Sequence, residues 1–275
     1  MSASDQAAHL KLYSTPEVAA QYARLDSLSV CEQYVFDNYL HPGTAILDLG
    51  VGGGRTTPYL SAIASRYVGV DYSEEMVQAC RSKFPHLEFE LADAADLSRF
   101  PDFSFDAVIF SFNGLDCLAP YGKRENCLRE CHRVLKRGGV YIFSTHNPRS
   151  LFLEWQWDRT RLRRLASKVA PQGLLFDLSL AVLTSGRVAL SVVRSCANAV
   201  SRGRRRLLSS AFWRGAGYVV DPSSYGARMY CGIPDCVVSE VTRIGFQLLQ
   251  VVPENYPGKP CEYSTRWYYY AASKD

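Results

Sequence analysis

The feature that most constrains the fold of this chain is a regular alternation of apolar runs and amphipathic stretches between residues 44 and 147. The apolar runs have the length of buried strands and lie at 45–51, 67–73, 87–93, 105–113 and 140–147. The stretches with helical spacing lie at 55–66, 73–84 and 122–139. Strands that alternate with helices at this spacing predict a parallel sheet covered by helices on both faces.

The alternation stops after residue 147 and returns near the end of the chain. A helix predicted at 235–245 precedes two further apolar runs, at 246–254 and 265–273, which predict a sixth and a seventh strand. The segment between is rich in Arg, Leu, Ser and Trp and shows helical spacing where it shows any. We therefore expect N-terminal helices that act as a lid (1–43), an α/β core (44–147 and 229–275) and a mostly helical insert after the fifth strand (148–228).

The insert separates positive charge from the rest of the chain. Residues 149–214 contain thirteen Lys or Arg and three acids, a net charge of +10, so the remaining residues carry −6. A basic segment that also contains tryptophans can cap an acceptor site, bind an anionic group or lie on a membrane surface. A solvated basic helix face is the alternative. Nucleic acid is the other partner that such charge suggests, but the sequence shows no appended RNA-binding module and we do not expect nucleic acid as the partner.

Composition indicates a globular protein of the cytoplasm. The first ten residues lack the charged and apolar regions of a signal peptide, and no run of 18 uncharged apolar residues occurs. The nine cysteines include no CxxC pair, which favours buried thiols in a reducing compartment over disulfides. Cys127 and Cys131 share one face of a predicted helix and are an alternative ligand pair, but we predict no metal site.

The stretch DLGVGGGRTT, residues 48–57, contains four glycines directly after the first apolar run. A P-loop requires a lysine here, and none is present in or beside this loop. A dinucleotide loop requires G-x-G-x-x-G/A, but its third position falls on Arg55 or Thr57. The pattern that remains is G-x-G-x-G at Gly50, Gly52 and Gly54, preceded by Asp48.

Acidic residues end the first three apolar runs. Asp48, Asp71 and Asp93 should therefore lie together, because the carboxyl ends of parallel strands share one edge of the sheet, where open α/β sheets bind ligands. A carboxylate suits an ammonium group, or accepts two hydroxyl hydrogens of a ribose, better than it suits a phosphate. For each aspartate alone, a turn or helix-cap role is the alternative.

These features together resemble motif I and the following motifs of the class I S-adenosylmethionine-dependent methyltransferases. FDAVIFSFNGLD is similar to the family's fourth-strand motif, RVLKRGG to its turn before the fifth strand, and VTRIGFQLLQV to the stretch leading to its sixth strand. The resemblance covers about residues 44–147 and 230–273. It implies a doubly wound, Rossmann-like sheet of seven strands with the last strand antiparallel. It also implies S-adenosylmethionine as the cofactor and S-adenosylhomocysteine as its product.

The same resemblance implies roles for individual residues. It places Asp71 on the ribose hydroxyls and Asp93 near the adenine amine, and it packs Tyr72 and Met76 on the adenine. Helix-core and loop-cap roles are the alternatives for Met76 and Asn113. The full set of predicted cofactor-binding residues is Asp48, Gly50, Gly52, Gly54, Asp71, Tyr72, Met76, Asp93, Ala94, Phe110, Ser111 and Asn113.

The implied reaction is methyl transfer by in-line displacement to an oxygen or nitrogen of a small or lipid-linked acceptor, such as a sugar, a polyketide or a similar metabolite. A general base is needed where the acceptor starts as a poorly acidic hydroxyl or a protonated amine. His146 follows the fifth strand at the ligand edge and is the candidate base, with a structural hydrogen-bonding role as the alternative. The candidate acceptor-site residues are Tyr13, Tyr22, Asn147, Trp155 and Tyr230.

The sequence leaves two other functions open. The basic insert would allow an RNA methyltransferase, although the chain has SFNGLD where amino-methylating DNA enzymes have [DN]PP[YF]. A protein that binds S-adenosylmethionine for regulation without catalysis would also keep the aspartates and glycines. The sequence predicts no oligomeric state.

Overall fold

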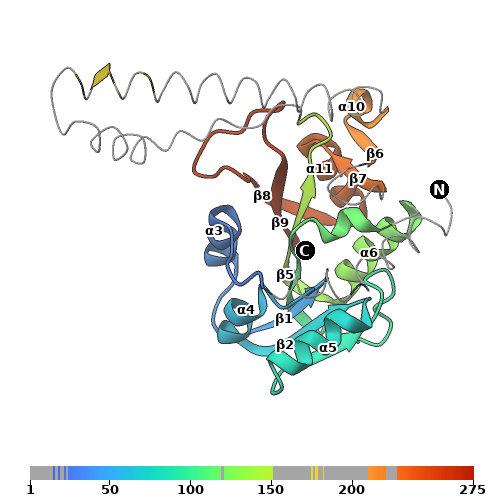
Figure 1. Cartoon of the computed structure of the whole chain (residues 1–275). Helices are drawn as coiled ribbons and strands as arrows, with labels where there is room; N and C mark the ends of the chain where they lie inside the picture. The colour runs from blue at the N-terminus through green and yellow to red at the C-terminus, as the bar shows by residue number, and fades with distance from the viewer. Residues whose placement is uncertain are drawn as a thin grey trace.

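The computed structural model describes residues 24–118, 121–150, 210–220 and 228–275, together with the single positions 15, 18, 22, 175, 177, 178 and 182. Its centre is a seven-stranded sheet (Figure 1). The strands of this sheet are β1 (Thr44–Leu49), β2 (Ala64–Asp71), β3 (Glu88–Leu91), β4 (Phe105–Phe110), β5 (Leu135–His146), β8 (Phe246–Pro253) and β9 (Trp267–Lys274). They lie in the order β3-β2-β1-β4-β5-β9-β8.

The strand directions confirm the predicted fold class. Strand β1 pairs in parallel with β2 and β4, β2 with β3, and β4 with β5. The last strand, β9, is antiparallel to both of its neighbours, β5 and β8. The chain reverses its direction of travel across the sheet between β1 and β4, and in open α/β sheets ligands bind in the crevice at such a point.

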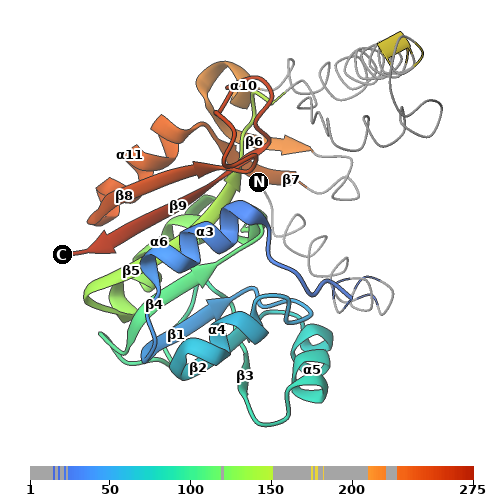
Figure 2. The ribbon, with the colours of Figure 1, turned by 90° about the vertical axis from the view of Figure 1, so that its left-hand side faces the viewer.

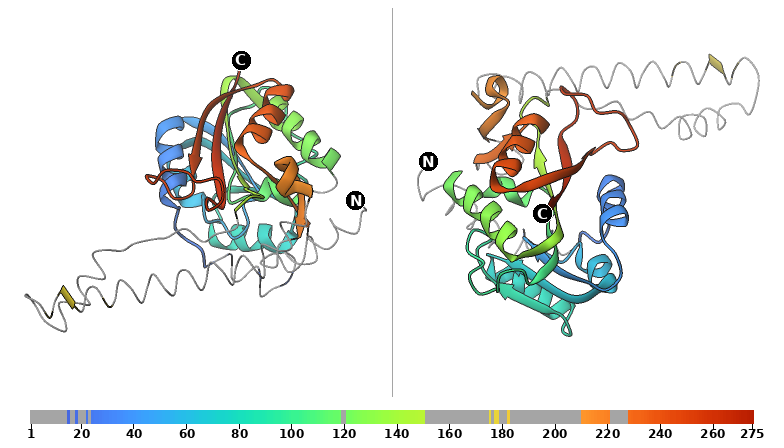
Figure 3. Two further views of the ribbon diagram at one scale, coloured as in Figure 1. Left: turned by 90° about the horizontal axis from the view of Figure 1, so that it is seen from above. Right: turned by 180° about the vertical axis from the view of Figure 1, so that it is seen from behind.

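Helices cover both faces of the sheet. They are α3 (Val30–Tyr39), α4 (Thr57–Ile63), α5 (Glu74–Lys83), α6 (Tyr121–Val134) and α11 (Pro234–Ile244). Helices α3, α4 and α5 bury their apolar side chains against one face, and α6 and α11 bury theirs against the other. Figure 2 shows α3 and α4 in front of the strands, and Figure 3 shows α6 and α11 on the opposite side. Within β1, Ile46 therefore packs into one core and Leu47 into the other.

Local signals place the ends of these helices. Ser73 caps α5, because its hydroxyl accepts a hydrogen bond from the backbone nitrogen of Met76 at 3.3 Å. Glu74 and Glu75 in the first turn add favourable charge at the helix N-terminus. Helix α11 ends at Ile244 and is capped by Gly245, whose φ of +113° favours glycine.

The predicted boundary between the helix at 122–139 and the fifth strand is wrong. Helix α6 ends at Val134, and β5 begins at Leu135, which pairs with Phe105 of β4. Lys136 therefore lies in the strand and forms an ion pair with Asp106 at 2.8 Å, instead of closing the helix. Pairing with β4 outweighs the helical pattern of the basic residues, because the strand adds ladder hydrogen bonds to an existing sheet.

A small antiparallel ribbon, which the sequence does not indicate, lies beside the main sheet. It consists of β6 (Ala216–Val220) and β7 (Arg228–Gly232), and it follows the short helix α10 (Ser210–Arg214). Val219, Met229 and Cys231 of the ribbon pack with Ala211 of α10. Most of the predicted insert, 148–228, lies outside the described residues.

The cysteines in the described part of the chain are not joined in disulfides. Of the nine cysteines, the eight in the described part of the chain are free thiols. The sulfurs of Cys127 and Cys131 are buried and 3.9 Å apart.

Within the described ranges, no helix combines the length and the apolar character that a membrane span needs. Over the same ranges, no three His, Cys, Asp or Glu side chains are grouped to hold a metal ion.

Candidate functional site

A pocket opens at the carboxyl edge of the sheet, next to the point where the strand order reverses. Residues that follow β1, β2, β3 and β4 all contribute to its walls. Ten of the twelve predicted cofactor-binding residues line it: Asp48, Gly50, Gly52, Asp71, Tyr72, Met76, Asp93, Ala94, Phe110 and Ser111. Gly54 and Asn113 are not among the lining residues.

The glycines of the loop serve two different purposes. Gly50 has a φ of +61°, and a Cβ atom built on it would lie 2.7 Å from Cε2 of Phe110. Only glycine therefore allows the loop to pass this close to the pocket wall. Gly54 has a φ of +79°, and its Cβ would lie 2.6 Å from Cε2 of Phe84, the residue that caps the end of α5. Gly54 thus serves the packing of the loop on α5.

Asp48 lies beneath the glycine loop and is 1% exposed. Its Oδ2 atom accepts hydrogen bonds from the hydroxyls of Thr56 at 2.6 Å and Tyr67 at 2.9 Å. Burial raises the pKa of Asp48 to about 6, although both hydroxyls and the nearby Arg55 favour its charged form. Asp48 therefore holds the start of α4 and also borders the pocket.

Asp71 ends β2 and accepts two backbone hydrogen bonds. The nitrogen of Gly52 donates to one oxygen and the nitrogen of Ser73 to the other, both at 2.9 Å. Burial raises the pKa of Asp71, and these backbone donors oppose the rise. Because each carboxylate oxygen can accept more than one hydrogen bond, Asp71 keeps capacity for a hydroxyl ligand.

Asp93 follows β3 and has a partner that the sequence does not indicate. One of its oxygens accepts from the backbone nitrogen of Ala95 at 2.9 Å, and the other forms an ion pair with Lys123 at the start of α6. The structure therefore brings the three predicted aspartates to one edge of the sheet, on adjacent strands. Within the described ranges, Asp93 is the only one of the three whose carboxylate is in direct contact with a cationic side chain.

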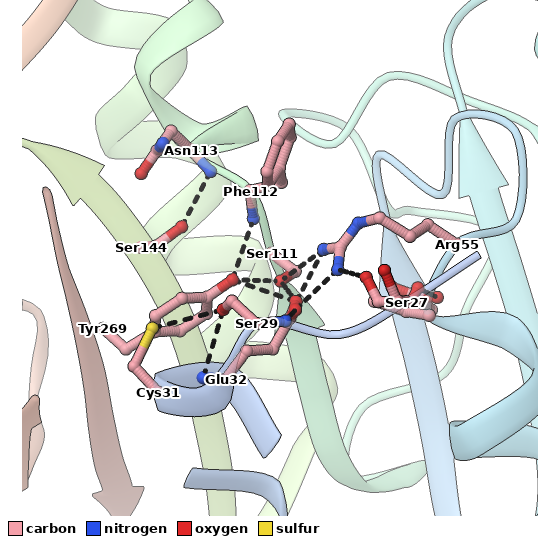
Figure 4. A network of polar contacts seen from close by, with 12 residues as sticks. Ser27, Ser29, Cys31, Glu32, Arg55, Ser111, Phe112, Asn113, Ser144 and Tyr269 are labelled. Atoms are coloured by element: carbon pink, nitrogen blue, oxygen red, sulfur yellow. Dashed lines mark hydrogen bonds and ion pairs between the residues drawn. The ribbon is translucent and has the colours of Figure 1, made fainter. Parts of the chain in front are cut away.

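A buried network joins the pocket to helix α3 and to β9 (Figure 4). Arg55 donates to the two oxygens of Glu32 at 2.5 and 2.6 Å. The same carboxylate accepts hydrogen bonds from the hydroxyls of Ser111 and Tyr269, the latter at 2.9 Å. Arg55 also lies over the ring of Phe112, 4.8 Å from its centre. Four separate segments therefore meet around one glutamate.

Sequence reasoning did not assign Glu32 to the site, although a signal for the residue is present. Ser29 and Glu32 form a capping box at the start of α3, in which each side chain accepts a hydrogen bond from the other residue's backbone. The S-x-x-E spacing predicts that helix start. The ion pair with Arg55 depends on the tertiary structure, because the two residues lie on different elements.

The charges around the pocket favour a cationic ligand. Its ionisable lining consists of three aspartates and Arg55, together with neutral tyrosine and cysteine side chains. Glu32 neutralises Arg55, and Lys123 neutralises Asp93. Asp48 and Asp71 then leave an excess of acid at the pocket, which suits an ammonium or sulfonium group and disfavours a phosphate.

His146 lies at the end of β5, at the same edge of the sheet. Its Nδ1 atom is 2.9 Å from Oδ2 of Asp116, and its Nε2 atom is 3.3 Å from Nδ2 of Asn113. Asn113 stands in the chain between Phe112 and Gly114, which both line the pocket. The candidate base is therefore adjacent to the pocket wall through Asn113.

The structure describes three of the five candidate acceptor-site residues. Tyr22 lines the pocket and packs with Met76. Asn147 is buried, and its amide nitrogen donates to the carbonyl oxygens of Glu262 at 2.6 Å and Thr265 at 2.9 Å. Both of its amide hydrogens therefore hold a loop instead of facing an acceptor.

Tyr230 is on the β7 ribbon, where its ring lies 4.5 Å from the guanidinium carbon of Arg124. It packs against a buried ion-pair cluster and is not among the residues that line the pocket. Tyr13 and Trp155, the other two candidates, lie outside the described residues.

The strand order, the glycine loop after β1 and the aspartates that end the next strands define an open α/β protein that binds a nucleoside-like ligand. A family model described as a methyltransferase domain matches residues 47–143. An uncharacterized methyltransferase of Synechocystis sp. is 32% identical over 150 residues, which cover 52% of this chain and 69% of that protein. The chain belongs to the class I S-adenosylmethionine-dependent methyltransferases.

Other similar proteins match a shorter part or share only the fold. A fatty-acid O-methyltransferase of Mycolicibacterium smegmatis is 32% identical over 118 residues, or 42% of this chain and 41% of that protein. The chain thus spans about two fifths of the length of the first curated relatives. The CcbJ methyltransferase of Streptomyces caelestis has a TM-score of 0.59 at 16% identity, with 97% of this chain and 99% of that chain covered, which shows a shared fold.

The pocket fits S-adenosylmethionine, the cofactor of this family. The cofactor carries an ammonium and a sulfonium, which match the acid excess at Asp48 and Asp71. Its ribose hydroxyls match the remaining acceptor capacity of Asp71. Met76 is 1% exposed and forms an apolar part of the pocket wall.

Proposed function

We propose that this chain transfers a methyl group from S-adenosylmethionine to an oxygen or nitrogen of a small or lipid-linked acceptor. The observation that carries the proposal is the meeting of the acidic glycine-loop pocket and His146 at one edge of the sheet. The cofactor supplies an activated methyl group, so the protein mainly has to align the acceptor and exclude water.

The residues have distinct roles in this proposal. Asp48, Asp71 and the glycine loop hold the cofactor, and Phe110 and Ser111 form the wall at the end of β4. His146 takes the proton from an acceptor that starts as a hydroxyl or a protonated amine. A positioned base of this kind contributes about 10²- to 10⁴-fold to the rate.

Two observations support a lipid-linked acceptor and contact with a membrane surface. The segment 149–214 has a net charge of +10, which would attract anionic lipids. The relative from Mycolicibacterium smegmatis is named for a fatty acid as its acceptor. Co-sedimentation with vesicles of anionic phospholipid should exceed that with neutral vesicles at low salt. Equal sedimentation with both would contradict the membrane contact.

Calorimetry with S-adenosylhomocysteine tests the first half of the proposal. We expect binding to the purified chain, and absence of binding would overturn the assignment of the pocket. Tritiated S-adenosylmethionine then tests transfer to long-chain fatty acids, phenols and amines, with the product counted after extraction. His146→Ala should keep cofactor binding but lower the turnover of the accepted substrate about 10²- to 10⁴-fold. His41→Ala, an exposed histidine, is the matched control.

The same samples distinguish the two alternative functions. An RNA methyltransferase should slow the migration of bulk RNA in a gel, and this effect should weaken steeply as the salt concentration rises. It should also transfer label to that RNA. Cofactor binding without label in any acceptor, including a whole-cell extract, would support a regulatory protein that binds the cofactor without catalysis.

A further inference from the structure

His146 has an anionic partner, Asp116, that the sequence pattern did not single out. Oδ2 of Asp116 lies 2.9 Å from Nδ1 of His146 and also accepts the backbone N–H of His146 at 2.8 Å. Asp116 belongs to the 3-10 turn η1 (Gly114–Cys117) and has no exposed surface. Because a carboxylate only accepts hydrogen bonds, the proton of a neutral His146 ring lies on Nδ1, and Nε2 carries a lone pair.

Asp116 is itself held from its other side. Its Oδ1 atom accepts hydrogen bonds from the hydroxyl of Thr145 and from Nη1 of Arg124, the latter at 3.2 Å. Arg124 is fully buried and donates from Nε to both oxygens of Glu240, at 3.0 and 3.1 Å. These contacts hold the orientation of the carboxylate toward His146.

The buried cluster around Asp116 contains one more acid than base. Asp116 and Glu240 are acids and Arg124 is the base between them, so the three side chains carry a formal charge of −1. The titratable groups near Arg124 and Asp116 include Tyr230, Tyr270, Tyr141 and Cys127, and burial raises the pKa of each, which keeps them neutral. Trp267, which pairs with His146 on the neighbouring strand, is also neutral. An imidazolium on His146, the species formed when the ring takes the proton of an acceptor, would make the formal charge of the cluster zero.

The opposite edge of the His146 ring faces Asn113. The backbone of Asn113 has a φ of +63°, and its N–H donates to the hydroxyl of Ser144 at 2.7 Å. Its Oδ1 atom is buried and has no hydrogen-bond partner among the described residues. The amide nitrogen of Asn113 lies 3.3 Å from Nε2 and donates to its lone pair, so a methyl acceptor has to replace this contact to reach Nε2, next to the unsatisfied Oδ1 of Asn113.

We propose that Asp116 is a positioning residue, which holds His146 with its hydrogen on Nδ1 so that Nε2 takes the proton of the acceptor. The inference rests on the proposed function. The acceptor oxygen or nitrogen forms its bond to the methyl carbon while the carbon–sulfur bond breaks and leaves its electron pair on sulfur. The acceptor's proton passes to Nε2 and then to water.

Nitrogen-15 NMR of histidine-labelled protein tests the tautomer without any acceptor. The signals of His146 are those lost in His146→Ala. In the native chain, at a pH where the ring is neutral, we expect the hydrogen on Nδ1. A hydrogen on Nε2 of His146 in the native chain would overturn the inference. The measurement uses the native chain, so it does not depend on whether a variant of Asp116 folds.

Asp116→Asn should shift the hydrogen away from Nδ1. Thr145→Val is the matched control, because it removes another donor to the same carboxylate and leaves the Nδ1 contact in place. The control should keep the native tautomer. A tautomer that is unchanged in a folded Asp116→Asn variant would contradict the positioning role.

We then measure kcat with the acceptor that the tritiated cofactor identifies. This measurement distinguishes failure of the Asp116 inference from failure of the proposed function on which it rests. Asp116→Asn should lower kcat at least 10²-fold in the native background and change it little in the His146→Ala background, because the two residues act as a unit. A normal kcat in His146→Ala would refute the base assignment itself. A normal kcat in Asp116→Asn, with a low kcat in His146→Ala, would refute only the role of Asp116.

Discussion

Arg55 of the glycine loop and Glu32 of α3 form a two-pronged ion pair, with nitrogen–oxygen distances of 2.5 and 2.6 Å. The glutamate has no exposed surface, and the hydroxyl of Tyr269 on β9 donates to it at 2.9 Å. The pair therefore joins the first helix of the described core, the pocket loop and the last strand. It also removes a positive charge from a pocket that has to receive a cation.

Glu32→Gln should destabilise the fold, because the change leaves the buried charge of Arg55 without its counterion. We expect the free energy of unfolding in urea to fall by about 3–5 kcal/mol. Glu125→Gln is the control, since Glu125 and its partner Arg129 are 41% and 62% exposed. Its cost should stay below about 1 kcal/mol. Equal losses in both variants would contradict a special role for the buried pair.

Gly50→Ala should disturb the pocket as well as the backbone. The new Cβ atom would lie 2.7 Å from Cε2 of Phe110, so the ring or the loop has to move. Gly138→Ala is the matched control, because Gly138 also has a positive φ, +72°, but no atom within 4 Å of the added Cβ. In each variant, backbone strain should lower the free energy of unfolding by about 1–2 kcal/mol.

Only Gly50→Ala should also weaken the binding of S-adenosylhomocysteine, measured by calorimetry. Native affinity in a folded Gly50→Ala variant would show that the loop does not lie close to the ligand.

Asp71→Asn should weaken cofactor binding more than it lowers the free energy of unfolding. The amide keeps one acceptor for the loop, but it replaces the second acceptor with a donor. We expect the Kd for S-adenosylhomocysteine to rise roughly 10- to 100-fold, as for the loss of one or two hydrogen bonds to a charged group. Asp106→Asn removes a carboxylate that pairs with Lys136 away from the pocket, and its Kd should remain native. Similar Kd values for both variants would remove Asp71 from the binding site.

Asp48 should make the stability of the ligand-free chain depend on pH. Burial raises its pKa from 3.8 to about 6, so the folded state holds the proton more tightly than the unfolded chain does. This stabilising contribution is fully present below pH 3.8 and is lost as the pH rises through about 6. Asp48→Asn cannot ionise, so its free energy of unfolding relative to the native chain should rise by about 3 kcal/mol across this range.

Urea unfolding of both proteins between pH 4 and 8 measures this difference. Asp26→Asn, at an exposed position, corrects for the general effect of removing one negative charge. If the free energies of unfolding of Asp48→Asn and the native chain differ by the same amount at every pH, Asp48 ionises alike in the folded and unfolded states.

Much of the pocket follows from short-range patterns in the sequence. Apolar runs with helical stretches between them are sufficient to predict the parallel strands. A parallel strand presents its carboxyl end at a known edge, so the sequence alone places Asp48, Asp71 and the glycine loop there. The errors are local, as at Lys136, where pairing with β4 outweighs a helical pattern.

Contacts between distant segments have no comparable signal. Glu32 and Tyr269 are 237 residues apart, and Asp116 and His146 are separated by 30. Nothing in the spacing of either pair requires them to meet. Periodicity and turn chemistry act over a few residues and are therefore visible in the sequence. The partner of a buried charge depends on which elements the folded core brings together, and only the three-dimensional arrangement supplies that information.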